Sequence, residues 1–137
     1  AIVMEVHCLQ RLKSSPLVVS LLWQAHLSGQ WIGIMDFCTG GELWAYVKHC
    51  GCCIDGEVAF FASQMVEALA VVHDAGITHR DVKCENFLIT EERRIKIIDF
   101  GTARDTQHPE VQVMLLGPQY EHHVGTPNFM SPEAIDG

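Results

Sequence analysis

Four polar side chains between residues 79 and 101 have the types and spacing needed to act on a polyphosphate. The stretch HRDVKCEN at 79–86 carries Asp81, Lys83 and Asn86, and DFG at 99–101 carries Asp99. Asp99 and Asn86 offer hard oxygen ligands of the kind that Mg²⁺ takes together with phosphate oxygens. Lys83 can neutralise charge on a transferring phosphoryl group, and Asp81 can orient a hydroxyl and accept its proton. The competing interpretation is that these side chains only form turns and caps in a polar loop.

A predicted β-hairpin brings the two motifs together. Residues 87–90 and 94–98 are predicted to form two strands joined by the charged turn EER. This hairpin returns Asp99 to the same end of the sheet as the preceding loop. A long helix is predicted before them at 56–75, with Asp55 as N-cap and Gly76 as C-terminal stop. Its predicted buried stripe consists of Val58, Ala62, Met65, Val66, Leu69 and Val72.

The remaining pattern predicts an α+β fold. Residues 1–13 have helical spacing and end at SSP, since the residue before proline avoids the helical region. Residues 17–25 and 30–37 are predicted to form an antiparallel pair joined by the turn LSG. A short helix at 42–49 and an extended segment at 77–80 follow, and residues 101–119 are predicted to be a long loop.

Composition excludes several classes of protein. The chain has 137 residues, of which 48% are hydrophobic and 19% charged, as in a globular domain. A formal charge of −8 argues against a nucleic-acid partner. The sequence has no apolar run of about 18 residues, so no transmembrane segment is predicted. No export signal is visible, which favours a cytoplasmic location.

The cysteines admit two interpretations. Cys50, Cys52 and Cys53 crowd together after His49, and His122 and His123 are adjacent. A small zinc domain would need paired ligands at fixed spacing, and no CxxC occurs. Ordinary reduced thiols are the preferred interpretation, and stoichiometric zinc in the purified protein would revive the other.

The motifs resemble those of protein kinases. HRDVKCEN resembles the catalytic loop H-R-D-x-x-x-x-N, DFG the magnesium-binding motif, and GTPNFMSPE at 125–133 the end of the activation segment. Lys83, two residues after Asp81, and Thr126 in GTP are typical of the serine/threonine branch. IIDFGTARD and VGTPNFMSPE are most similar to the AGC group, particularly phosphoinositide-dependent kinase-like members.

The resemblance implies an ATP-binding site with particular residues. Met35 matches the gatekeeper, and 36–38 match the hinge, where the backbone of Asp36 and Cys38 would hold adenine. Glu42 in TGGEL matches the acid that bonds the ribose hydroxyls. Leu88 and Ile98 fall where such kinases line the adenine slot.

Other positions match structural or regulatory residues of the family. Glu5 matches the ion-pairing glutamate of the regulatory helix, although a lone helical glutamate is often only solvated. Arg80 would pair with the DFG region or with an activating phosphate. Glu133 would pair with an arginine further along a kinase chain. His79 is expected to be a packed structural residue, and Cys84 replaces the commoner proline of the catalytic loop without inactivating it.

The resemblance also implies a partial, bilobal fold. Residues 1–34 would be part of a small β-containing N-lobe, 35–38 the hinge, and 39–137 part of a mostly helical C-lobe. The glycine-rich loop and strand-three lysine of the family would precede residue 1, and the lower C-lobe would follow residue 137. We therefore expect negligible turnover and poor solubility from these residues alone.

The expected function is ATP-dependent phosphorylation of Ser or Thr hydroxyls of proteins, with Mg²⁺ as cofactor. The alternative is a truncated, catalytically inactive kinase-like module that binds a partner or a nucleotide. Where AGC kinases carry an activating Ser or Thr, this chain has His122, and Thr102, Thr106 and Tyr120 are poor substitutes. Activation by phosphorylation at that site is therefore not expected.

Overall fold

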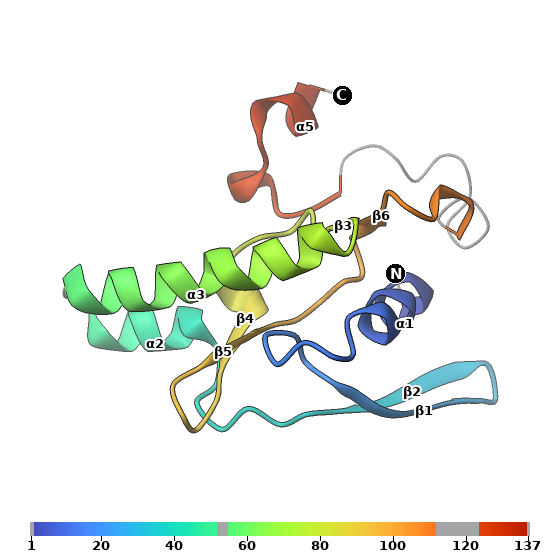
Figure 1. Cartoon of the computed structure of the whole chain (residues 1–137), viewed down its shortest axis with the longest axis horizontal. Helices are drawn as coiled ribbons and strands as arrows, with labels where there is room; N and C mark the ends of the chain where they lie inside the picture. Colours follow the sequence, from blue (N-terminus) through green and yellow to red (C-terminus); the bar gives the residue numbers. More distant parts are fainter. Residues whose placement is uncertain (1, 52–54, 112–123, 137) are drawn as a thin grey trace.

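A computed structural model describes residues 2–51, 55–111 and 124–136 (Figure 1). The fold is α+β, as predicted. Its named elements are α1 (Ile2–Arg11), β1 (Leu21–Leu27), β2 (Gln30–Met35), α2 (Leu43–Cys50), α3 (Asp55–Asp74), β3 (Ile77–Thr78), η1 (Cys84–Asn86), β4 (Phe87–Ile89), β5 (Ile95–Ile97), β6 (Arg104–Asp105), η2 (Pro127–Phe129) and α5 (Pro132–Asp136). No helix in the described ranges is both long and apolar enough to cross a membrane.

The strands pair into three short antiparallel ribbons within the described residues. The ribbon β1–β2 turns at Ser28 and Gly29, whose φ angles of 49° and 80° are the positive values that a two-residue hairpin needs. The hairpin β4–β5 pairs Phe87 with Ile97. Both hairpins were predicted, because alternating apolar residues on each side of a turn signal carry that information locally.

The elements form two groups on either side of β5 and the chain that continues from it (Figure 1). Helices α2 and α3 lie side by side, with the Tyr46 and Phe61 rings 5.3 Å apart edge to face. On the other side α1 lies beside the β1–β2 ribbon. The buried core between the groups consists of Met4, Cys8, Leu9, Leu12, Leu17, Val18, Val19, Leu43, Phe61, Ala68, Val72, Ile77, Phe87, Ile89, Ile95, Ile97, Phe100 and Ala103.

The first strand begins later than predicted. Residues 17–19 are buried, but they run beside β5 instead of extending β1: Ile97 N–H donates to Leu17 O at 2.8 Å and Val19 N–H donates to Ile97 O at 3.2 Å. A short apolar run is compatible both with an extension of β1 and with a segment beside β5, so the sequence could not distinguish these two positions.

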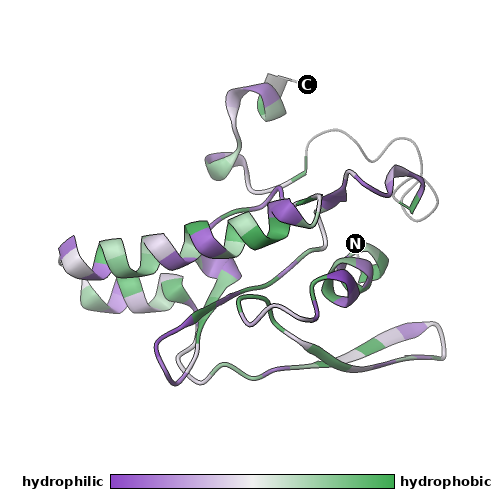
Figure 2. Cartoon of the chain, in the orientation of Figure 1, coloured by the Kyte–Doolittle hydropathy of each residue, from purple (hydrophilic) through white to green (hydrophobic). Residues whose placement is uncertain are grey.

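The predicted buried stripe of α3 is only partly right. Val72 is buried and Met65 and Leu69 pack against the core, but Val58 and Val66 are 53% and 67% exposed. The buried face also carries Phe61, Gln64 and Ala68, which were not predicted. Apolar residues occur on more than one side of α3 (Figure 2), so helical periodicity did not select one face. The Gln64 side chain holds one face of α3 against β5, because it forms hydrogen bonds with the backbone of Ile95 and Arg93.

The ends of α3 agree closely with prediction. Asp55 is the first residue of the helix in the described ranges and not the residue before it. Gly76 has φ = 71° and its N–H donates to His73 O at 2.8 Å, as expected of a C-terminal stop.

The region predicted as a loop at 101–119 contains regular structure. Arg104 and Asp105 form β6, which pairs with β3, and residues 109–111 form a helical turn. A two-residue strand is too short for any periodic pattern, so only the long-range pairing reveals it. His122, His123, Tyr120, Cys52 and Cys53 lie outside the described residues.

Candidate active site

His79 joins the HRD and DFG motifs in the interior. Its side chain is 1% exposed, its Nε2 lies 2.8 Å from Ile98 O, and its ring meets Phe100 edge to face at 5.0 Å. The Asp81 N–H donates to Nδ1 at 3.3 Å, so Nε2 carries the proton that bonds the carbonyl. Burial lowers the pKa of His79, which keeps the ring neutral despite the nearby carboxylates. The prediction of a packed structural histidine is confirmed.

Asp81 is held on three sides. Its carboxylate lies 2.8 Å from Lys83 Nζ, accepts the Thr126 N–H at 2.8 Å and the Thr126 hydroxyl at 2.7 Å, and accepts Asn86 Nδ2 at 3.1 Å. Burial acts to raise the pKa of Asp81, but the bonds from Lys83, Thr126 and Asn86 together lower it. The carboxylate is thus ionised and held in a fixed position, as a group that orients a hydroxyl must be.

Thr126 completes a triangle with the two charged residues of the loop. Lys83 Nζ donates to Thr126 Oγ1 at 2.6 Å, and that hydroxyl donates to Asp81. The bond from Asp81 raises the pKa of Lys83 and so holds the ammonium charged. More than forty residues separate Thr126 from Asp81 in sequence, and only folding brings them together.

Asn86 and Asp99 lie next to each other across the backbone. Asn86 O accepts the Ile98 N–H at 3.0 Å, and Asn86 Nδ2 donates to Asp81 O at 2.8 Å. Asp99 is exposed, has φ = 61°, and accepts the Gly101 N–H on Oδ1 at 3.2 Å. The amide oxygen of Asn86 and the carboxylate of Asp99 are hard oxygen donors of the kind that Mg²⁺ binds, with few protein ligands.

Denser metal cages are absent from the described ranges. No group of three or more His, Cys, Asp or Glu side chains there could hold an ion. Cys8, Cys38, Cys50 and Cys84 form no disulfide in the described ranges, and the other two cysteines of the cluster after His49 lie outside those ranges.

The predicted hinge residues follow β2. Asp36 accepts the Ser20 N–H at 3.1 Å and lies 2.6 Å from Lys96 Nζ in β5. Burial acts to raise the pKa of Asp36, and the bonds from Lys96 and Ser20 bring it below its usual value. Met35 is 39% exposed at the end of β2, and Cys38 is buried. Sequence reasoning missed Lys96, whose signal is only a polar residue in the middle of the apolar strand IKI.

The other predicted nucleotide residues meet at β4. Glu42 is exposed before α2 and forms an isolated bridge with Leu88, and Leu88 is half-buried. Ile98 is half-buried one residue beyond β5. The backbone therefore brings Glu42 beside Leu88, and Ile98 beside Asn86 of the catalytic loop.

The three predicted structural or regulatory residues lie in different parts of the structure. Burial raises the pKa of Glu5, and the negative charge of Asp99 raises it further. Arg80 has φ = 66° and donates from Nε to Thr102 O at 2.7 Å, which matches its predicted pairing with the DFG region. Glu133 is exposed in α5, where the Ser131 hydroxyl lowers its pKa.

A second polar centre was missed by sequence reasoning. Asp105 in β6 is fully buried and binds His7 and Arg11 of α1. The only sequence signal was an acid four residues after DFG in a region that reads as a loop.

Comparison with known proteins identifies the family. The family model of the protein kinase domain matches residues 1–137, so the chain belongs to the protein kinase domain family. Among its relatives is the serine/threonine-protein kinase PKH2 of Candida albicans, 31% identical over 134 residues, or 96% of this chain and 14% of that protein. Another is the probable cAMP-dependent protein kinase catalytic subunit of Encephalitozoon cuniculi, 34% identical over 132 residues, 96% of this chain and 38% of that protein.

The relatives also confirm the predicted branch. The serine/threonine-protein kinase akt-1 of Caenorhabditis elegans is 31% identical over 132 residues, 96% of this chain and 23% of that protein. The relatives include AGC members, as the motifs indicated. The chain spans well under half the length of these relatives, from 14% to 38%.

Proposed function

We propose that this chain is part of a serine/threonine protein kinase that transfers the γ-phosphoryl group of ATP to hydroxyls of protein substrates. The observation that carries the proposal is the Asp81 carboxylate, held 2.8 Å from Lys83 and bonded to Thr126 and Asn86. A fixed, ionised acid beside a lysine is what orientation of a hydroxyl and stabilisation of a transferring phosphoryl group require.

Each residue has a defined part in this proposal. Asp81 orients the substrate hydroxyl and takes its proton, and Lys83 contacts the phosphoryl group. Asn86 and Asp99 would hold Mg²⁺, which when bound neutralises charge on the phosphates. Asp81 and Lys83 are in direct contact, and the Thr126 hydroxyl bonds both of them.

The nucleotide is proposed to lie between two parts of the chain. In this proposal residues 1–34 belong to an N-lobe, 35–38 form the hinge, and 39–137 belong to a C-lobe. The adenine and ribose would meet Met35, Asp36, Cys38, Glu42, Leu88 and Ile98. The cytoplasmic location remains a prediction.

The test uses the full-length natural protein and two matched substitutions. Asp81→Asn should abolish transfer of labelled phosphate from ATP to protein, by roughly a hundredfold or more, while leaving Mg²⁺-dependent nucleotide binding intact. Asp99→Asn should abolish both. Asp74→Asn, an exposed acid at the end of α3, serves as the control and should change neither.

Two results would contradict the proposal. Transfer that survives Asp81→Asn would remove its central residue. Nucleotide binding that ignores both Mg²⁺ and Asp99→Asn, or a protein that binds a partner without any transfer, would favour the alternative of a non-catalytic module.

A further inference from the structure

Asp105 is a fully buried acid whose two oxygens are both engaged. Its Oδ2 lies 2.7 Å from His7 Nε2 and 2.5 Å from Arg11 Nη1, and its Oδ1 accepts the backbone N–H groups of Gln107 and His108 at 3.0 and 3.1 Å. Arg11 Nη2 also donates to the Gln107 side chain at 2.8 Å. We call Asp105, His7, Arg11 and Gln107 the Asp105 cluster.

The charge of Asp105 is maintained in the interior by these partners. Burial acts to raise its pKa, but the bonds from His7, Arg11 and the Gln107 N–H bring the pKa below its usual value. The neighbouring thiol responds to that charge: burial raises the pKa of Cys8 to about 12, with a further contribution from Asp105. A buried carboxylate that loses its partners is strongly unfavourable, so the cluster favours a single position of α1.

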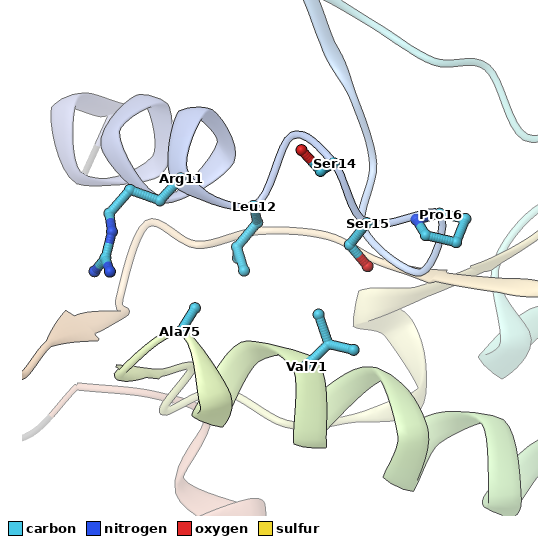
Figure 3. Close-up of a pocket in the computed structure, with 7 residues that line it drawn as sticks. All are labelled: Arg11, Leu12, Ser14, Ser15, Pro16, Val71 and Ala75. Atoms are coloured by element: carbon cyan, nitrogen blue, oxygen red, sulfur yellow. The ribbon is translucent and has the colours of Figure 1, made fainter.

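The end of α1 borders a hollow on the side that faces α3, although Leu9 and Leu12 are buried in the core. This hollow of about 370 Å³ separates the end of α1 from the end of α3 and is lined by Arg11, Leu12, Ser14, Ser15, Pro16, Val71 and Ala75 (Figure 3). In that view the guanidinium of Arg11 points away from Ser14 and Ser15. Arg11 lines the hollow, and its guanidinium binds Asp105, so this bond connects the end of α1 to β6.

Asp105 is also fixed relative to both motifs of the candidate site. In the β3–β6 pair it lies opposite Ile77, just before the HRD motif, and Ala103 and Phe100 of the intervening segment are buried. Glu5 lies on the same helix as His7 and Arg11, and the charge of Asp99 reaches it. The position of Glu5 relative to Asp99 therefore depends on how α1 is attached to β6.

We propose that Asp105 is a positioning residue for phosphoryl transfer, which holds α1 and its Glu5 against the DFG segment through His7 and Arg11. This inference rests on the proposed function. Asp105 touches none of the reacting groups and acts through the helix.

The experiment compares Asp105→Asn, Arg11→Gln and Arg11→Lys in the full-length protein, with Lys13→Gln as control. Lys13 is an exposed cation near the same end of α1. The measurements are kcat and KM for ATP, thermal unfolding, and hydrogen exchange of residues 2–11 at a temperature where every variant is folded. A displaced helix should lower kcat roughly ten- to a hundredfold in Asp105→Asn, with faster exchange in α1.

The Arg11 variants distinguish a positioning role from a purely structural one. The Arg11 side chain is 23% exposed, but its loss leaves the buried Asp105 carboxylate with fewer partners, so the two Arg11 variants are compared with the folded fraction of each measured. Arg11→Lys keeps a charged donor and should retain more of kcat than Arg11→Gln at equal folded fraction, and Lys13→Gln should stay within about twofold of the unmodified protein.

Two outcomes overturn the inference. Arg11→Gln and Asp105→Asn proteins that keep kcat within about twofold would show that the cluster only stabilises the fold, and unchanged exchange in α1 would show that the contact does not hold the helix. Absence of transfer by the unmodified protein would instead overturn the proposed function, and this role with it.

Discussion

Thr126 donates two hydrogen bonds to the carboxylate of Asp81, one from its backbone N–H at 2.8 Å and one from its hydroxyl at 2.7 Å. The residue that follows the activation-segment glycine is thereby attached to the centre of the catalytic loop. The same hydroxyl accepts Lys83 Nζ at 2.6 Å, so it sets the geometry of both charged groups.

Replacement of the Thr126 hydroxyl should reduce phosphoryl transfer. Thr126→Val keeps the shape and the backbone bond but removes both hydroxyl bonds, each to a charged group and worth about 1.5–3 kcal/mol. We expect activity to fall about tenfold or more, measured as initial rate of phosphate transfer. Thr126→Ser retains the hydroxyl and is the control; equal rates for the two variants would contradict the role.

Gly125→Ala should detach the segment 124–126 from the catalytic loop. Gly125 has φ = 114°, and a Cβ there would lie 2.5 Å from Arg80 O, a backbone atom that cannot move aside easily. We expect strong loss of transfer, measured as the initial rate of phosphate transfer. Gly29→Ala also has positive φ but meets nothing within 4 Å, so it isolates conformational strain from the clash. Similar losses in the two variants would be evidence against a specific close approach.

Gln64→Leu should destabilise the fold, although the two side chains have similar volumes. Gln64 is 4% exposed, accepts the Ile95 N–H at 3.2 Å, and donates to Arg93 O at 3.4 Å. Its loss leaves a buried N–H in β5 unsatisfied, which costs about 1–3 kcal/mol of the free energy of unfolding, measured by urea denaturation. Gln10→Leu on the exposed face of α1 is the control, and an equal effect there would refute the argument.

Acid should destabilise the protein below about pH 4. The pKa values of Asp81 and Asp105 are lowered in the fold from the ordinary value of 3.8. A lowered folded pKa contributes stability that is complete above the unfolded value and is lost as pH falls through the folded one. Melting temperatures recorded from pH 6 to pH 2 should fall most steeply below 3.8.

The Asp105→Asn protein provides the check on this prediction. It lacks one of the titrating groups, so its melting temperature should depend less on pH than that of the unmodified protein, and the two curves should converge in acid. Parallel curves across the whole range would show that Asp105 contributes nothing to the acid sensitivity.

Much of the fold could be predicted because its signals are local. The helix at the start, both hairpins and the stop at Gly76 each depend on a few neighbouring residues, and the structure agrees with them. The buried face of α3 could be predicted only in part, since two faces carry apolar residues. The choice depends on Gln64 meeting β5, which is about thirty residues away in sequence.

The sequence by itself determined the family and the residue types of the site, because HRDVKCEN and DFG carry their chemistry in side-chain identity and short spacing. Only the tertiary structure decided how those groups are held. Thr126 reaches Asp81 from 45 residues away, and Asp105 binds His7 from 98 residues away. Such contacts form because a buried charge must find donors wherever the fold places them, and no local pattern records which donors those will be.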